Sequence, residues 1–368
     1  MRIGFYAPMK PPDALNPSGD RTIARLLIRV LTMAGHDVTV LSGLRTWDGR
    51  GDPALQAQLE EEARADVKRV LNESPERPDL LFTYHCHYKA PDLLGPALAK
   101  KWACPYVIAE GSFSPKRADG PWAGFHARSL EALRAATCHL VLSPRDRSGI
   151  EAAARPGAHI LDLPPMLDTA PFAALDPPPT DGPVTLLTIA MMRAGEKTWS
   201  YRFLIEALAQ LQAVDGLPTW CWSVVGDGAA RSDIEALARS RLRVPITWHG
   251  ALDTDAVLAA LAGAHIFAWP GLGEGIGMVY LEAQAAGRPV LAVDGPGPAA
   301  VIVPPVGGWL TPQDPPAYAA RLADLIRNGS IRSWMGAAGR NRVERAHGLT
   351  ITARRLDRVL TRLVETHR

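Results

Sequence analysis

Residues 271–290 read GLGEGIGMVYLEAQAAGRPV, and this stretch decides the fold of the chain. The residues before it, 266–269, form an apolar run of strand length, which Pro270 ends. Alternate glycines then keep side chains away from the backbone, so that a ligand can approach it closely. From Met278 the apolar spacing becomes helical, and Gly287 is placed to end that helix. The stretch therefore predicts a strand, a glycine-rich loop and a helix in succession.

This predicted loop and helix have the features of an anion-binding site. A helix N-terminus that follows a glycine-rich loop presents unpaired backbone N–H groups and the positive end of the helix dipole. Such a site suits phosphate best. The backbone that we expect to meet the phosphate belongs to Gly275, Ile276, Gly277, Met278 and Val279.

Two glutamates bracket the predicted phosphate site. Glu274 lies in the loop and Glu282 follows in the helix. Because phosphate repels a carboxylate, these side chains are better suited to hydroxyl groups on either side of it, such as the sugar ring and the ribose of a nucleotide sugar. The alternative is that Glu274 is a solvated loop residue and that Glu282 lies on a helix face.

This region resembles the family 4 retaining glycosyltransferases of the GT-B fold. The spacing of Glu274 and Glu282 and the continuation AQAAGRPV match the E-x7-E signature of that family. Similar motifs occur in the same order along the C-terminal half: VVGDG at 224–228, WHG at 248–250 and GGWLTPQDP at 307–315. Several motifs in the right order are more specific than any one of them.

Composition indicates a globular protein with two domains. The chain has 368 residues, of which 47% are hydrophobic and 21% charged, and a net charge of +2 does not suggest a nucleic-acid partner. The four cysteines lack metal-ligand or disulfide spacing, which fits a reducing compartment. The N-terminus reads as a buried strand and no apolar run is long enough to span a membrane, so we expect a cytoplasmic location.

The N-terminal half opens with a strand, a helix and a second strand, over residues 3–6, 21–33 and 36–41. In the resembling family a glycine loop after the first strand lies against the donor phosphates. Gly19 is the position that matches, although Ser18 is equally suited to cap the following helix. On this helix Arg21, Arg25 and Arg29 form a basic stripe, which is either a solvated face or a peripheral contact with an anionic inner-membrane surface.

Polar residues follow two further strands of this half. The strand at 79–84 precedes His85 and His87, which lack the additional ligands that zinc requires. The resemblance implies that a histidine here supports the donor sugar, and His85 matches that position best, with His87 as the second choice. Glu110 follows the strand at 106–109, where the family often has histidine, and is a candidate contact for acceptor hydroxyls. Lys116 and nearby Arg117 are candidates to meet an acidic acceptor.

The second half begins after a proline-rich segment at 163–183, whose composition is typical of an interdomain linker. After the strand at 184–189, Arg193 and Lys197 match the cations that touch the donor diphosphate in the family, before a helix predicted over 201–211. Further alternation of strands and helices predicts a parallel sheet with ligands at the C-terminal ends of its strands. Gly250 matches the position that passes the nucleotide base. Asp253 resembles part of a metal-binding DxD motif but is better explained as a helix N-cap.

These observations predict an α/β protein with the GT-B fold, in which two Rossmann-like doubly wound domains face a central cleft. We expect an N-terminal acceptor domain at 1–165, a linker at 166–183, a nucleotide-sugar donor domain at 184–347 and a C-terminal helix at 348–368 that crosses back to the first domain.

The resemblance implies a retaining, metal-independent glycosyltransferase that uses no cofactor besides its nucleotide-sugar co-substrate. The acceptor class stays open among glycans, lipid-linked acceptors and small metabolites. His85, Glu274, Arg193 and Lys197 are the predicted catalytic residues. Two alternatives are a nucleotide-sugar epimerase on the same fold and a non-catalytic protein that binds sugar nucleotides or polysaccharide.

Overall fold

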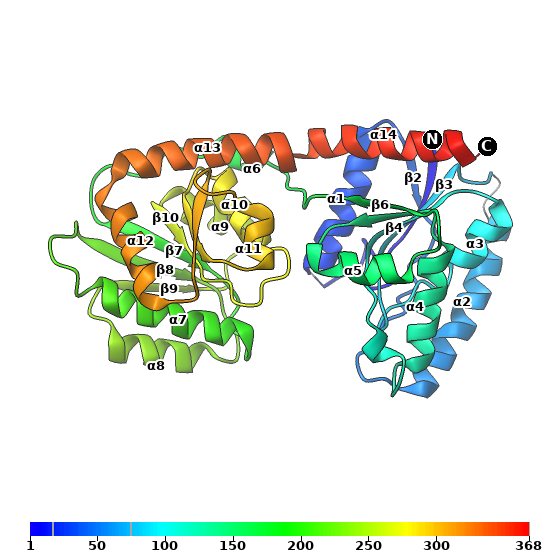
Figure 1. The fold of residues 1–368 in the computed structure, drawn as a ribbon, viewed down its shortest axis with the longest axis horizontal. Coiled ribbons are helices and arrows are strands. Elements are labelled where there is room, and N and C mark those ends of the chain that lie inside the picture. The colour runs from blue at the N-terminus through cyan, green and yellow to red at the C-terminus, as the bar shows by residue number, and fades with distance from the viewer. Residues whose placement is uncertain (17, 74–75, 368) are drawn as a thin grey trace. The chain divides into compact units, whose positions relative to one another are not determined.

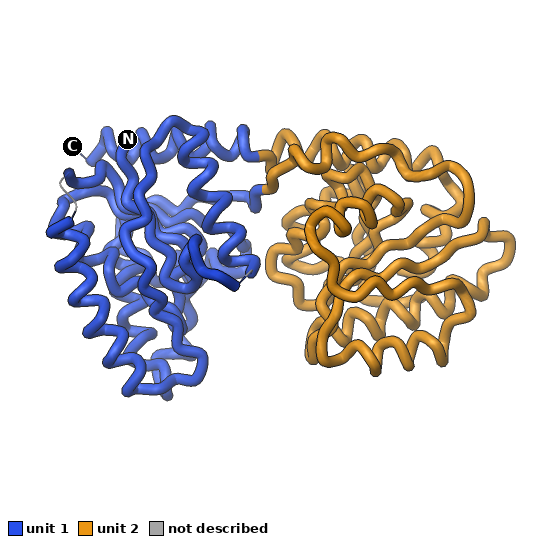
Figure 2. Tube along the Cα trace, turned by 180° about the vertical axis from the view of Figure 1, so that it is seen from behind, with its two compact units in different colours: residues 1–166, 349–368 blue, residues 167–348 orange. Residues whose placement is uncertain are grey.

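The computed structural model describes residues 1–16, 18–73 and 76–367. The chain forms two compact units, of which the first comprises Met1–Met166 together with Leu349–Arg368 and the second comprises Leu167–Gly348 (Figure 2). The segment predicted as a linker, 166–183, belongs to the second unit except for Met166. It includes the one-turn helix α6 (Ala170–Ala173). The chain therefore passes between the units at two places, after Met166 and after Gly348.

The first unit is built on a parallel sheet with the strand order β2-β1-β3-β4-β5-β6 (Figure 1). The chain starts inside this sheet, next to its edge strand β2, because β1 pairs with both β2 and β3. Phe5 of β1 and Phe82 of β3 stack in the core with ring centroids 5.8 Å apart. The strands are β1 (Arg2–Tyr6), β2 (Asp37–Val40), β3 (Leu80–Cys86), β4 (Tyr106–Gly111), β5 (Cys138–Val141) and β6 (His159–Asp162).

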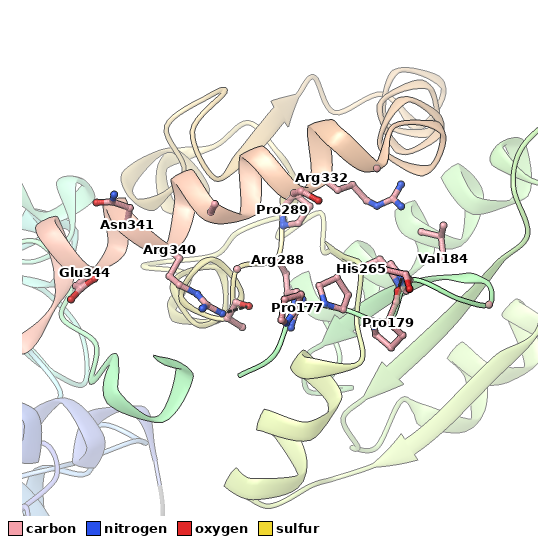
Figure 3. A pocket seen from close by; sticks show the side chains of 18 of the residues that line it. Pro177, Pro179, Val184, His265, Arg288, Pro289, Arg332, Arg340, Asn341 and Glu344 are labelled. Carbon is pink, nitrogen blue, oxygen red and sulfur yellow. Dashed lines mark hydrogen bonds between the residues drawn. The ribbon is translucent and has the colours of Figure 1, made fainter. Parts of the chain in front are cut away.

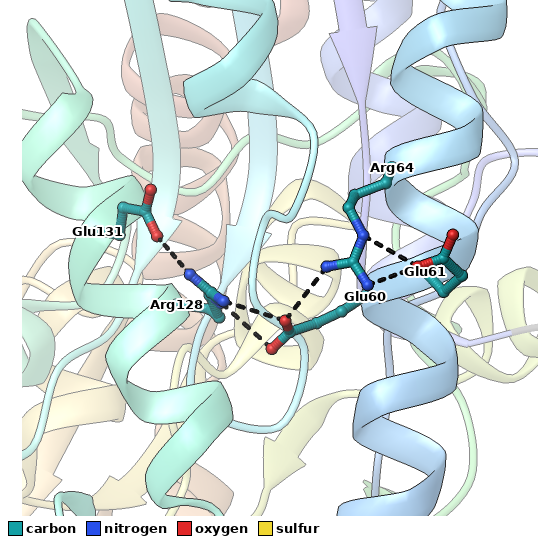
Figure 4. A network of polar contacts seen from close by, with 5 residues as sticks. All are labelled: Glu60, Glu61, Arg64, Arg128 and Glu131. Carbon is teal, nitrogen blue, oxygen red and sulfur yellow. Dashed lines mark hydrogen bonds and ion pairs between the residues drawn. The ribbon is translucent and has the colours of Figure 1, made fainter.

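Helices cover both faces of the first sheet. On one face α1 packs against α14, and on the other α2, α3, α4 and α5 pack against one another. An ion-pair network links α2 to α4, in which Glu60 accepts hydrogen bonds from Arg128 and also approaches Arg64 (Figure 4). The helices are α1 (Gly19–Met33), α2 (Pro53–Glu73), α3 (Gly95–Trp102), the 3-10 turn η1 (Pro115–Arg117), α4 (Ala123–Ala135), α5 (Pro144–Ala153) and α14 (Leu349–His367).

The second unit repeats this architecture with the strand order β12-β11-β10-β7-β8-β9, again all parallel (Figure 1). The direction of winding reverses between β7 and β10, so these neighbouring strands mark the topological switch point where α/β sheets bind ligands. The strands are β7 (Val184–Ile189), β8 (Trp220–Val225), β9 (Ile246–Gly250), β10 (Ile266–Ala268), β11 (Val290–Val293) and β12 (Gly308–Thr311).

The helices of the second unit also divide between two faces. The pairs α7–α8 and α7–α12 pack on one face, whereas α10 contacts α11 and α13 on the other. Large aromatic side chains fill the core between the layers, including Trp222, Trp269 and Tyr280, each 0% exposed. The helices are α7 (Glu196–Leu211), α8 (Arg231–Arg241), α9 (Thr254–Ala262), α10 (Met278–Ala285), α11 (Pro296–Val301), α12 (Pro315–Arg327) and α13 (Gly329–His347).

The C-terminal helix α14 belongs to the first unit, as predicted from the sequence. Its buried residues Leu356, Leu360 and Leu363 recur at helical spacing, and α14 lies beside α1. This spacing gives the helix one apolar stripe that can be buried only against another element. Within the described residues, no helix is long and apolar enough to cross a lipid bilayer.

Two expected elements differ from those observed, and one observed strand was not expected. β3 extends through Cys86, so that His85 lies within the strand and not after it. Helix α7 begins at Glu196, five residues before the expected start, and Lys197 therefore lies on its first turn. An acidic residue at a helix start favours this earlier beginning, because it interacts well with the helix dipole. The sequence also gave no expectation for β6, a short strand at the sheet edge.

Candidate functional site

The glycine-rich loop between β10 and α10 has a conformation that other residues would not adopt. Gly271, Gly273 and Gly277 have φ values of 69°, 75° and 71°. A Cβ atom on Gly271 would lie 1.8 Å from the Tyr280 hydroxyl, which itself donates a 3.1 Å hydrogen bond to the Trp269 carbonyl. Left-handed backbone and close packing together explain why glycine occupies these positions.

The predicted site residues Lys197 and Glu274 meet directly in this loop. Lys197 Nζ forms an ion pair with Glu274 Oε1, and Trp269 Nε1 donates a 3.0 Å hydrogen bond to the same oxygen. The lysine ammonium also lies 5.5 Å from the centroid of the Trp269 ring. The side chains of Lys197 and Glu274 are only 23% and 15% exposed. The indole and the ammonium thus hold the Glu274 carboxylate in one orientation.

Helix α7 fixes the position of the loop. Ser200 Oγ accepts a 2.9 Å hydrogen bond from the Leu272 N–H. A Cβ atom on Gly273 would lie 2.2 Å from the Glu196 carboxylate carbon, so the loop passes close to the first turn of α7. Arg193 precedes this helix with an exposed side chain, and its carbonyl accepts a 2.7 Å bond from the Thr198 hydroxyl. Arg193 therefore lies outside the Lys197–Glu274 pair.

Helix α10 begins where the sequence predicted, at Met278, with Gly277 as its N-cap. Its first N–H groups have no acceptor within the helix, as at any helix start. It ends in a Schellman motif, because the Gly287 N–H donates to the Gln284 carbonyl and the Arg288 N–H to the Ala283 carbonyl, both at 2.9 Å. The backbone of Gly275, Ile276, Met278 and Val279 is thus at the C-terminal edge of the sheet, beside the Lys197–Glu274 pair.

Among the carboxyl groups described in the second unit, Glu282 has the most strongly shifted pKa. It lies on α10 after the first turn, and burial raises its pKa from 4.5 to about 7. Within the part of the chain that the structure describes, no ion pair or hydrogen bond compensates this burial. A carboxyl group held in this way is poised to bind hydroxyl groups or to exchange a proton near neutral pH.

Gly250 is the last residue of β9, beside the end of the neighbouring strand β8. Its φ is 72°, and its carbonyl accepts a 2.8 Å hydrogen bond from the Gly226 N–H. A Cβ atom on Gly250 would lie 3.1 Å from a guanidinium nitrogen of Arg231, which pairs with Asp227 at 3.2 Å. Asp253 accepts a bond from the Ala256 N–H at 2.9 Å and is confirmed as a helix N-cap.

In the first unit, His85 pairs with a residue that the sequence analysis missed. His85 Nδ1 lies 3.0 Å from Asp20 Oδ1, on the first turn of α1. Burial opposes the imidazolium, but the hydrogen bond to Asp20 and nearby carboxylates raise the pKa of His85 above its usual value. The hydrogen bond to His85 lowers the pKa of Asp20 in turn. The position of Asp20 directly after Gly19, at a predicted helix start, was the available signal.

His87 is engaged differently from His85. The two rings meet edge to face with centroids 4.9 Å apart. His87 Nδ1 accepts a 2.9 Å hydrogen bond from the Lys89 N–H, so this nitrogen is unprotonated. Burial and the neighbouring His85 lower the pKa of His87 to about 3. His87 is therefore a neutral, hydrogen-bonded histidine that supports the His85 ring.

Two residues of this region hold strained backbone at the ends of adjacent strands. His85 on β3 has a φ of 64° and Glu110 on β4 has a φ of 57°. Burial raises the pKa of Glu110, although His85 and Tyr84 act in the opposite direction. Among the described residues, Glu110 Oε2 has no hydrogen-bond partner. Strained non-glycine residues of this kind cluster at functional sites, because neighbouring structure must hold them in place.

At the start of α1 the backbone of Gly19 is open, and two arginines of the helix bind the preceding loop. A Cβ atom on Gly19 would meet no atom within 4 Å, so the backbone there is open. Ser18 Oγ caps α1 by accepting a 3.2 Å bond from the Arg21 N–H. The Arg21 guanidinium donates to the carbonyls of Ala14 and Leu15 at 2.8 and 2.9 Å, and Arg25 Nε donates to the Pro12 carbonyl at 2.6 Å. These two arginines therefore hold the preceding loop against α1.

Within the described residues, no three His, Cys, Asp or Glu side chains gather in a way that could hold a metal ion. His85 and His87 are adjacent but recruit no third ligand of this kind. The polar groups of the two units are instead organised as a lysine–glutamate pair beside a helix start and as a histidine–aspartate pair at a strand end.

Comparison with known proteins identifies relatives of this chain. Residues 183–328 match the family described as "Glycosyl transferases group 1". The chain is 34% identical over 164 residues to a GDP-mannose-dependent monoacylated alpha-(1-6)-phosphatidylinositol monomannoside mannosyltransferase of Corynebacterium glutamicum, over 43% of this chain and 42% of the relative. It is 28% identical over 283 residues to a D-inositol 3-phosphate glycosyltransferase of Xylanimonas cellulosilytica, over 70% of this chain and 66% of the relative.

The chain thus spans less than two thirds of the length of either relative. The solved structure of sucrose-phosphate synthase from Thermosynechococcus elongatus is similar over 99% of both chains, with a TM-score of 0.71 and 19% identity. This similarity shows the fold, which is GT-B. The resemblance to family 4 and the two Rossmann-like units predicted from the sequence are confirmed.

Proposed function

We propose that this chain transfers a sugar from a nucleoside diphosphate sugar to an acceptor hydroxyl. The proposal starts from the GT-B fold and from the match of residues 183–328 to the glycosyl transferases group 1 family. The transfer retains the configuration of the anomeric carbon and needs no metal ion. The observation that carries this proposal is the Lys197–Glu274–Trp269 cluster beside the start of α10.

The donor diphosphate binds at the start of α10. The free N–H groups there and the helix dipole attract the phosphates. Lys197 exchanges its partner Glu274 for a phosphate oxygen, and the exposed Arg193 side chain supplies a second cation. These fixed positive charges stabilise the charge that develops on the departing diphosphate, which is the role that a metal ion plays in other transferases.

The two glutamates then bind hydroxyl groups on either side of the diphosphate. Glu274, released by Lys197 but still held by the Trp269 indole, orients the hydroxyls of the sugar. Glu282 binds the ribose, because its partly buried carboxylate lacks another partner in the described structure and gains from hydrogen-bond donors. Gly250 lets the backbone approach the base, since this residue itself has no side chain.

The first unit contributes His85 and Gly19. His85, with its Nδ1 held by Asp20, supports the sugar near the reacting carbon. Gly19 gives the diphosphate access to the start of α1. No side chain is assigned as a nucleophile. The acceptor attacks from the side of the departing phosphate, whose oxygen takes the proton of the acceptor hydroxyl, so that configuration is retained.

The acceptor belongs to the polyol or glycolipid class. The two relatives described above are named for a phosphatidylinositol mannoside and for an inositol phosphate. We include in the proposal a cytoplasmic location and a peripheral contact of Arg21, Arg25 and Arg29 with anionic lipid. Cosedimentation of the protein with phosphatidylglycerol vesicles tests the lipid contact, which charge-neutral vesicles should not reproduce.

A donor screen tests the proposed reaction. The protein is incubated with GDP-mannose, UDP-glucose and related donors, with and without inositol phosphate, in buffer that contains EDTA. Donor hydrolysis supports the proposal, as does transfer in which NMR shows the same anomeric configuration in the product as in the donor. Transfer that EDTA abolishes contradicts metal independence, and inverted products contradict retention. A new sugar nucleotide formed without acceptor would identify an epimerase, whereas tight binding without any reaction would identify a binding protein.

A further inference from the structure

A groove lies in the second unit, at the N-terminal edge of the sheet and opposite to the glycine loop (Figure 3). Its volume is about 930 Å³. The walls are the proline-rich segment that precedes β7, the turn between α10 and β11, and the face of α13 that carries Arg332, Arg340 and Glu344. Substrates of α/β sheets bind at the C-terminal strand edge, so this groove is not part of the donor site.

The groove is strongly cationic. Four arginines line it against a single carboxylate, that of Glu344. None of these arginines forms an ion pair with a residue that the structure describes. The arginines are Arg288, Arg332, Arg340 and Arg345.

Arg288 is the central cation of the groove. It is 1% exposed, and among the described residues its Nε has no hydrogen-bond partner. Its Nη2 donates a 2.7 Å hydrogen bond to the carbonyl of Asp176. Burial and the neighbouring Arg340 lower the pKa of Arg288 to about 10. A buried guanidinium without a carboxylate partner is costly, and a bound anion would remove this cost.

Arg340 lies next to Arg288 and is already well positioned. Its Nε donates to the Ala285 carbonyl at 3.0 Å, and its Nη2 donates to the carbonyls of Ala286 and Leu175 at 3.1 and 3.3 Å. These bonds satisfy the end of α10, but no carboxylate of the described residues pairs with the guanidinium. Figure 3 shows Arg340 reaching from α13 toward the turn that carries Arg288.

The opposite wall of the groove is pinned by neutral groups. His265 accepts a 3.0 Å bond from the Thr185 N–H at Nδ1, and its Nε2 lies 2.8 Å from the Pro179 carbonyl. Both nitrogens are therefore occupied in a neutral imidazole, and burial lowers the pKa of His265. This arrangement holds the proline-rich segment over the groove without adding negative charge.

We propose that this groove binds a phosphate group, through Arg288 and Arg340 with Arg345 at its exposed end. Guanidinium groups match phosphate oxygens with paired N–H donors, and Asn341 and Ser333 add neutral donors to the lining. The bound phosphate would fasten the proline-rich segment to α13. These two segments adjoin the two places where the chain passes between the units.

Thermal shift and calorimetry at constant ionic strength test this site in the full-length chain. Inorganic phosphate forms one arm and glucose 6-phosphate the other, with sodium chloride as the ionic control. Since phosphate also suits the donor loop, every titration is repeated in Lys197→Ala. Phosphate is expected to raise the melting temperature of both the wild type and Lys197→Ala. A response to glucose 6-phosphate alone would identify a phosphomonoester as the ligand.

Variants of the groove assign the binding to its arginines. Arg288→Gln and Arg345→Gln should each weaken the apparent Kd for phosphate by about 10-fold or more, the scale of one charge-assisted hydrogen bond. Arg345 is exposed, so its substitution leaves the fold intact if Arg288→Gln does not. Arg239→Gln on α8 is the matched control and should not change binding, because Arg239 does not line the groove. Absence of binding to both inorganic phosphate and glucose 6-phosphate, or binding lost in Lys197→Ala and unchanged in Arg345→Gln, would overturn the proposal.

Discussion

At the scale of single residues, the candidate site is defined by the charged and titratable side chains of both units. Lys197 and Glu274 compensate each other in the structure, and Trp269 holds the carboxylate in place. Glu282 has no such compensation, and its pKa is about 7. In the first unit, Asp20 sets the protonation of His85. Each of these interactions has a separate measurable consequence.

Lys197→Ala should lower turnover by a factor on the order of 10² or more, the scale for the loss of one contact that stabilises transition-state charge. Loss of the lysine also leaves Glu274 bound only to the Trp269 indole. Steady-state kinetics with a saturating donor measures the effect, and Lys197→Arg, which keeps the charge, should recover part of the rate. Wild-type turnover in Lys197→Ala would exclude the proposed role.

Glu282 should make donor binding depend on pH. If its ionised carboxylate binds the ribose, donor affinity should rise as the pH increases through about 7, where this group loses its proton in the free protein. Calorimetry between pH 6 and pH 8 measures this dependence. In Glu282→Gln the affinity should be lower and its pH dependence weaker. An equal pH dependence in both proteins would show that another group titrates.

The Glu282 carboxyl group should also make the stability of the fold depend on pH, but here stability should fall as the pH rises. A carboxyl group whose pKa is raised in the folded state binds its proton more tightly there than in the unfolded state. Its contribution to stability is therefore full below the unfolded value of 4.5 and declines until about pH 7. Glu282→Gln should gain stability relative to the wild type over this interval, as denaturation at pH 4.5 and pH 7.5 would show.

Asp20→Asn should lower the pKa of His85, because the substitution removes the carboxylate that stabilises the imidazolium. An NMR titration of the histidine side chains measures this change, with the exposed His159 as an internal reference in both proteins. A pKa of His85 that is unchanged in Asp20→Asn would contradict the pairing seen in the structure.

At the scale of elements, the site depends on the start of α10 and on its loop. Gly277 has left-handed backbone, and a Cβ atom there would lie 2.6 Å from the Tyr280 ring. Gly275 differs, since its φ is not positive and a Cβ atom there would meet nothing within 4 Å. The loop therefore contains glycines that the fold requires, such as Gly277, and one, Gly275, that leaves space for a ligand.

This difference predicts separate outcomes for two alanine substitutions. Gly277→Ala should destabilise the second unit by at least about 1–2 kcal/mol, the cost of left-handed backbone before any clash is counted. Gly275→Ala should leave the melting temperature nearly unchanged but weaken donor binding, because its methyl group projects into open space beside the phosphate site. Melting curves and donor titrations of both variants provide the comparison. Normal donor affinity in Gly275→Ala would place the diphosphate elsewhere.

At the scale of the whole molecule, each unit has its own sheet and core, and the chain passes between them twice. The second passage places α14 on the first unit, beside α1. The stability of the first unit thus depends on residues that follow the second unit in the sequence. Truncating a buried residue of α14 tests this dependence.

Leu360→Ala should destabilise the first unit by about 2–5 kcal/mol, since Leu360 is 0% exposed and its truncation leaves a cavity. Hydrogen exchange should accelerate in β1 and β3, whereas β7 and β8 of the second unit should be unaffected. The exposed Arg358→Ala on the same helix serves as the control. Equal acceleration in both units would show that they unfold together.

The sequence by itself determined the features that depend on local order. Alternate glycines before an apolar helical pattern predicted the loop and the start of α10 at Met278, and the Gly287 signal predicted its end. These features follow from backbone sterics and hydrogen bonding over a few neighbouring residues. The apolar stripe of the last helix similarly required a partner surface, which α1 provides.

The tertiary structure alone decided which distant residues meet. Lys197 and Glu274 are separated by 77 positions, and Asp20 and His85 by 65 positions. The groove lined by arginines likewise joins the proline-rich segment to α13 across much of the second unit. Local propensity does not encode such pairings. They arise because parallel strands bring the ends of separate βα units to the same sheet edge, where burial then sets the charge of each side chain.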